Sequence, residues 1–77
     1  MKFFLIAYDR RQGKLLDMKE FPEGQRARAL RERFAREVVE RDRPDVEVVL
    51  LGAESQADLE KTHARYFKTL EQIAAST

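Results

Sequence analysis

The 77 residues allow only one small domain, residues 1–77. A typical domain holds about 100–150 residues, so a second domain in this length would have no core. Fifteen basic against fourteen acidic residues leave a net charge of +1, which argues against a dedicated nucleic-acid-binding protein. The absence of cysteine excludes disulfides and cysteine-ligated metals, and the single histidine excludes a histidine-rich metal site, so we expect no metal and no cofactor.

The first half of the chain begins with a hairpin pattern. Residues 3–9 are aromatic and aliphatic and predict a first strand. Residues 10–13 end in Gly13, which suits a tight turn. Residues 14–21 then predict a second strand, antiparallel to the first, and Pro22 ends it.

A helix, a strand and a second helix complete the predicted order ββαβα. Residues 23–41 predict the first helix because apolar residues recur at steps of three and four. These residues are Ala27, Leu30, Phe34 and Val38. Residues 46–51 predict the third strand. Ser55 and Asp58 resemble the capping pair of a second helix. The apolar residues expected along it are Leu59, His63, Tyr66, Phe67, Leu70 and Ile73.

The connections predict an α+β fold of two layers. A right-handed crossover between the second and third strands leaves room for the first strand between them. We therefore expect a three-stranded sheet of order 2-1-3, with both helices on one face. Two alternatives stay open: the third strand beside the second, or the second helix on the far face.

Side-chain alternation divides the strands into two apolar sets. With Asp9 and Lys14 flanking the hairpin, Leu5 is expected to oppose Met18 and Ala7 to oppose Leu16, under the helices. The other face would carry Asp17 and Lys19 farther out. Its apolar residues would be Phe4, Ile6, Tyr8, Leu15, Val49 and Leu51.

The apolar residues on this second sheet face are the basis for a prediction of function. Burying several such side chains is worth several kcal/mol at about 25 cal/mol per Å², and monomers seldom expose large apolar patches. We therefore expect a non-catalytic interaction or adaptor protein that forms a homodimer, or binds another protein, through this sheet face.

Basic side chains suggest a second hypothesis, a nucleic-acid-binding accessory protein. Its contacts would come from the hairpin and from one face of the second helix, namely Arg10, Arg11, Lys14, Lys61, Arg65 and Lys68. The arginines of the first helix are instead expected to form ion pairs at a spacing of four residues. These pairs are Arg28–Glu32, Arg33–Glu37 and Arg36–Glu40.

His63 carries the third hypothesis, an enzyme or small-ligand sensor at a dimer interface. Acid–base partners would be Tyr66, Asp17 or Glu20, whereas its position beside Leu59 and Phe67 favours a histidine at the edge of the core. The loop 51–55 enters a helix, but Glu54 and Asp58 would repel a phosphate there.

Two features bear on location. The apolar run 3–8 is far shorter than the roughly 18 residues of a membrane span, and no targeting signal is recognised. Ten of the fifteen basic residues are arginine, which is typical of a GC-rich bacterial genome. We expect a bacterial, cytoplasmic protein without membrane contact.

Overall fold

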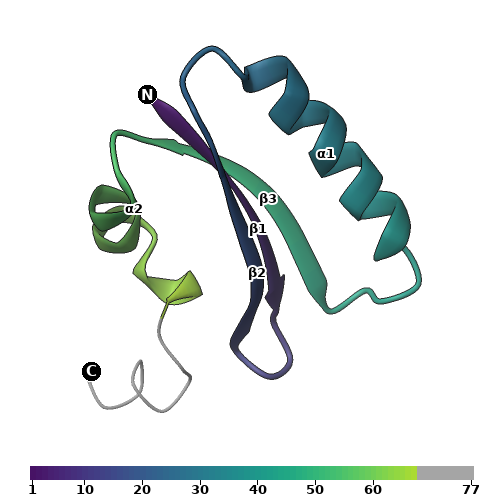
Figure 1. Cartoon of the computed structure of the whole chain (residues 1–77). Coiled ribbons are helices and arrows are strands. Elements are labelled where there is room, and N and C mark those ends of the chain that lie inside the picture. Colours follow the sequence, from purple (N-terminus) through teal and green to yellow (C-terminus); the bar gives the residue numbers. More distant parts are fainter. Residues whose placement is uncertain (68–77) are drawn as a thin grey trace.

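The computed structural model describes residues 1–67 of the chain. Its elements are β1 (Lys2–Asp9), β2 (Lys14–Phe21), α1 (Arg26–Val39), β3 (Val46–Ala53), α2 (Gln56–Thr62) and η1, a single 3-10 turn (Ala64–Tyr66). Figure 1 shows a curved sheet with α1 on one side and α2 with η1 on the other. No helix within residues 1–67 is long and apolar enough to cross a membrane.

The sheet has the predicted order, β2-β1-β3, and confirms the α+β class. β1 is central and antiparallel to both neighbours. Gly13 adopts a φ of 64° in the hairpin turn, where a side chain would be strained. The hairpin begins in the expected register, with Asp9 opposite Lys14 and Tyr8 opposite Leu15.

A β-bulge changes the register of β2 beyond this point. Ala7 opposes Asp17, so Leu16 has no opposite residue, and Met18 opposes Ile6. The predicted pairs Leu5–Met18 and Ala7–Leu16 are therefore wrong. Because the extra residue shifts every later side chain to the other face, Asp17 and Lys19 lie on the α1 side of the sheet instead of the opposite side.

The predicted placement of both helices on one face is also wrong. α1 packs over the face that carries Leu5, and Glu32 and Arg36 of the helix line a groove with this residue. On the opposite face, Leu59 of α2 and Tyr66 of η1 pack against the side chains of β1. Each apolar face of the sheet thus receives one helical cover, the arrangement that the sequence had left as an alternative.

The second helix is shorter than its apolar pattern predicts. Ser55 accepts a hydrogen bond of 3.1 Å from the backbone N–H of Asp58, as the capping motif predicts. α2 ends at Thr62, because His63 has a non-helical φ of −128° and ψ of 47°. The chain then makes the short turn η1, which brings Tyr66 back onto the sheet. The predicted positions Leu70 and Ile73 lie outside the described residues.

Candidate interaction surface

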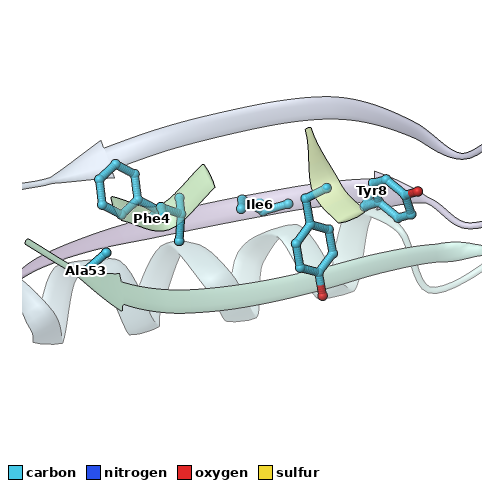
Figure 2. Packing of buried hydrophobic residues seen from close by; sticks show 6 residues of the cluster. Phe4, Ile6, Tyr8 and Ala53 are labelled. Carbon is cyan, nitrogen blue, oxygen red and sulfur yellow. The ribbon is translucent and has the colours of Figure 1, made fainter. Parts of the chain in front are cut away.

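The sheet face predicted to be a dimer interface lies inside the chain. Phe4 and Ile6 are 0% exposed, and Tyr8 is buried with them. Figure 2 shows these three side chains along β1, together with Ala53 of β3. The other three predicted residues are half-buried and pack against this core, namely Leu15, Val49 and Leu51. The prediction of a sheet-against-sheet interface on this face is therefore wrong, because α2 and η1 already cover the face.

A polar cluster of Glu47, Arg65 and Tyr66 attaches η1 to β3. The Tyr66 hydroxyl donates a hydrogen bond of 2.7 Å to the Glu47 carboxylate, and the Arg65 guanidinium also pairs with this carboxylate. Arg65 lies over the ring of Tyr66, 4.5 Å from its centroid. The rings of Tyr8 and Tyr66 meet edge to face, with centroids 5.1 Å apart. This cluster closes the edge of the core beneath η1.

The charge state of the cluster follows from these contacts. Partial burial opposes ionisation of Glu47, but the hydrogen bond from Tyr66 and the charge of Arg65 hold the pKa of Glu47 below its usual value. Burial and the bond to Glu47 raise the pKa of Tyr66. The folded state therefore favours the ionised carboxylate and the neutral phenol.

α1 turns its charged side to the sheet. Ala29 is 0% exposed, and Glu40, just beyond the end of the helix, is buried as well. Arg36 pairs with both Glu40 and Asp17, at 3.2 and 3.1 Å. Glu32 pairs with Lys19 at 2.7 Å. α1 thus contacts β2 through Asp17 and Lys19, the residues that the β-bulge moved to this face, and through Phe21, whose ring centroid lies 5.6 Å from the guanidinium of Arg28.

The predicted intrahelical ion pairs are all present. Arg28 and Glu32 lie 3.2 Å apart, Arg33 and Glu37 2.8 Å, and Arg36 and Glu40 3.2 Å. These pairs occupy several of the helix's arginines, as the spacing of four residues predicts.

The apolar stripe of α1 faces outward. Phe34 is 64% and Val38 61% exposed, and both lie one or two turns beyond the half-buried Leu30. A stripe at this spacing normally faces the core. Here the opposite side of the helix does so, and an apolar surface is left on the outside of the molecule. We call Leu30, Phe34 and Val38 the outer stripe of α1.

Two grooves fix the direction of the outer stripe. Toward β2, a groove of about 340 Å³ is lined by Leu5, Ala35 and Val39, among others. Toward β3, a groove of about 330 Å³ is lined by Arg33 and Glu37 with the β3 valines 46 and 48. At about 100° per residue, Leu30 lies roughly 20° from Glu37 and Phe34 roughly 60° from it, on the solvent side. Leu30 and Phe34 of the outer stripe therefore lie toward the β3 flank of α1, whereas Val38, roughly 100° from Glu37, points to solvent.

The basic residues of the nucleic-acid hypothesis occupy three separate elements. Arg10 donates a hydrogen bond of 2.6 Å to the carbonyl oxygen of Pro44, and Arg65 pairs with Glu47. The remaining described members, Arg11, Lys14 and Lys61, are exposed on the hairpin and α2. Lys68 lies outside the described residues. Nucleic-acid binding stays a prediction, although two of its arginines already have partners within the chain.

His63 lies half-buried at the end of α2, as expected for the edge of the core. Its ring is tilted against that of Tyr66, with centroids 6.4 Å apart. The Tyr66 hydroxyl donates a hydrogen bond to Glu47, and Asp17 lies on the α1 face of the sheet, so neither is arranged as an acid–base partner. Residues 1–67 hold no cluster of three metal-ligating side chains.

No family model, no curated protein and no solved structure matches this sequence.

Proposed function

We propose that the protein is a non-catalytic interaction module, and that its binding surface is the outer stripe of α1. The observation that carries this proposal is the exposure of Phe34 and Val38 on a helix whose opposite side holds charged residues against the sheet. Fully burying a Val, Leu or Phe side chain is worth about 1.5–3 kcal/mol. A partner that covered the outer stripe would gain several kcal/mol.

The state of the buried polar groups supports a role without catalysis. Asp9 accepts hydrogen bonds from the backbone N–H groups of Arg11 and Gln12, and Glu40 is paired with Arg36 and Arg43. In the described part of the chain, every buried side-chain nitrogen or oxygen has a hydrogen-bond partner.

The arginine-rich composition supports a bacterial source, and we place the interaction in the cytoplasm.

A photo-crosslinking experiment tests the surface. A photoreactive phenylalanine analogue at position 34 should crosslink the chain to one protein of defined mass in the cells that express it. The matched control places the same analogue at Gln56, which is exposed on α2 across the sheet. Adducts from position 34 but not from position 56 support the proposal. Monomer alone from both, or equal adducts from both, would show that the outer stripe is not the binding surface.

A further inference from the structure

We infer that the partner on this surface is a second copy of the chain, joined by antiparallel pairing of two β3 edges, with the two α1 helices side by side. The inference rests on the proposed function and names its occupant. It would make one continuous sheet of two three-stranded halves, related by a two-fold axis between the β3 strands.

The first observation is the free edge of β3. In the part of the chain that the structure describes, β3 pairs only with β1, which leaves the backbone groups along its other side without a strand partner. Natural edge strands are usually protected by lysines, prolines or bulges. β3 is eight residues long, and its sequence VEVVLLGA carries a single charged residue, Glu47. Such an edge readily accepts another strand.

The other edge provides a contrast within the same sheet. β2 also has eight residues, but its sequence KLLDMKEF carries Lys14 and Lys19 with two acidic residues, and a bulge interrupts its pairing with β1. These are the features that discourage edge-to-edge pairing. Of the two edges, β3 is therefore the one that fits a partner.

The second observation is the position of α1. The helix packs on β1 and β3, so its axis lies about half a strand spacing inside β3. With strands about 4.8 Å apart, a two-fold axis beside β3 would place the two α1 axes roughly 10 Å apart. Packed helices lie about 8–10 Å apart. The pairing that satisfies the β3 edge thus brings the helices to contact distance.

The side chains at this contact are the outer stripe. Leu30 lies on the β3 flank of α1, close in angle to Glu37 in the groove over β3, and Phe34 lies at the solvent side of this flank. In the paired arrangement they would face their copies across the two-fold axis. A self-complementary patch is the requirement of a two-fold interface, and this flank meets it with the apolar Leu30 and Phe34 beside the ion pair of Arg33 and Glu37.

The charge along α1 favours the antiparallel direction that the strands impose. Four arginines and one glutamate lie between positions 26 and 33, whereas residues 34–43 carry three arginines and three acidic residues, so that end of the helix is neutral. A parallel helix pair would align the arginine-rich ends, which repel. The antiparallel pair sets each arginine-rich end against the neutral end of its neighbour, which avoids this repulsion.

The test combines molecular mass with hydrogen exchange on the purified chain. Light scattering should give twice the 9.0 kDa of one chain. Alternate β3 amides on the outer edge should gain protection of roughly tenfold or more as the protein concentration rises. The outer amides of β2 serve as the control and should exchange rapidly throughout.

Two variants separate the interface from the fold. Phe34→Glu should halve the mass and abolish the concentration-dependent protection of β3, because the charge would face its copy. Ala35→Glu adds the same charge on the β2 flank of α1, at an exposed position, and should keep the doubled mass.

The outcomes separate the inference from the proposed function. A doubled mass with rapidly exchanging outer β3 amides would overturn strand pairing but leave the outer stripe as the binding surface. A monomer at every concentration, together with a cellular adduct at position 34, would show that the partner is a different protein. Loss of the doubled mass in both variants would also overturn the proposed arrangement.

Discussion

The hydroxyl of Tyr66 donates a hydrogen bond of 2.7 Å to the carboxylate of Glu47, which connects η1 to β3 across 19 residues of sequence. The bond is partly buried, and the same carboxylate also pairs with Arg65. Since the ring of Tyr66 is at the same time part of the hydrophobic core, this one side chain joins the polar edge of the α2 face to its apolar interior.

Removing the hydroxyl of Tyr66 should weaken this attachment without removing the ring. Tyr66→Phe is expected to lower the free energy of unfolding by about 1 kcal/mol, the usual net value of one hydrogen bond. Urea denaturation followed by circular dichroism measures it. Tyr66→Ala should cost about 3–5 kcal/mol, because the core also loses its ring. Equal losses in both variants would mean that the ring contributes nothing.

The lowered pKa of Glu47 predicts a loss of stability in acid. A carboxyl group whose pKa is depressed on folding stabilises the protein above its usual pKa of 4.5, and this contribution disappears as the pH falls through the lower folded-state value. The urea midpoint of the wild type should therefore fall more steeply below pH 4.5 than that of Glu47→Gln. Parallel curves for the two proteins would contradict the assignment.

Ile6 should be essential for folding, because it is 0% exposed beneath α2 and η1. We expect Ile6→Ala to destabilise the fold by about 2–5 kcal/mol and Ile6→Asp to unfold the chain, since a buried, unpaired charge is costly. Val39→Ala is the control, because Val39 is 72% exposed. A folded Ile6→Asp variant with half the mass of the wild type would restore the sheet-face interface that the sequence suggested.

Two glycines should respond differently to a methyl group. Gly24 has a φ of +88° with open space around it, so Gly24→Ala is expected to cost about 1 kcal/mol from backbone strain alone. At Gly52 a new Cβ would lie 2.5 Å from Sδ of Met1, an exposed and flexible side chain that can move. Gly52→Ala should therefore cost less than Gly24→Ala in thermal unfolding. The opposite order would show that Met1 is held in place.

Local signals in the sequence predicted most of the fold. The hairpin, the order of the elements, the Ser55 cap and the ion pairs of α1 follow from turn residues, capping and spacing, which depend on few neighbours. The β-bulge at Leu16 has no such signal. The bulge places Asp17 and Lys19 on the α1 side of the sheet, because one extra residue moves every later side chain of the strand to the other face.

The interface prediction failed for a different reason. Alternation correctly showed that β1 is apolar on both sides, but it does not indicate which segment covers each side. α2 ends early at Thr62, and the following turn brings Tyr66 against Tyr8 of β1, which no periodicity shows. The sequence shows the residues of the outer stripe as apolar positions that repeat every four residues along the helix. The orientation of this stripe away from the sheet follows from the exposure of Phe34 and from the ion pairs that α1 makes with Asp17 and Lys19, the residues that the bulge moved to this face.

The orientation of α1 can be tested with one substitution made on each side of the helix. Ala29 is 0% exposed against the sheet, whereas Ala27 is exposed on the outer side, about 160° around the helix. Ala29→Leu should therefore lower the free energy of unfolding by about 1–3 kcal/mol, because the contact has no room for three more carbon atoms. Ala27→Leu should change it by no more than about 0.5 kcal/mol. Chemical denaturation of the two variants measures both values under identical conditions. If Ala27→Leu were the damaging change and Ala29→Leu the tolerated one, the outer stripe would face the sheet, and Phe34 would belong to the core.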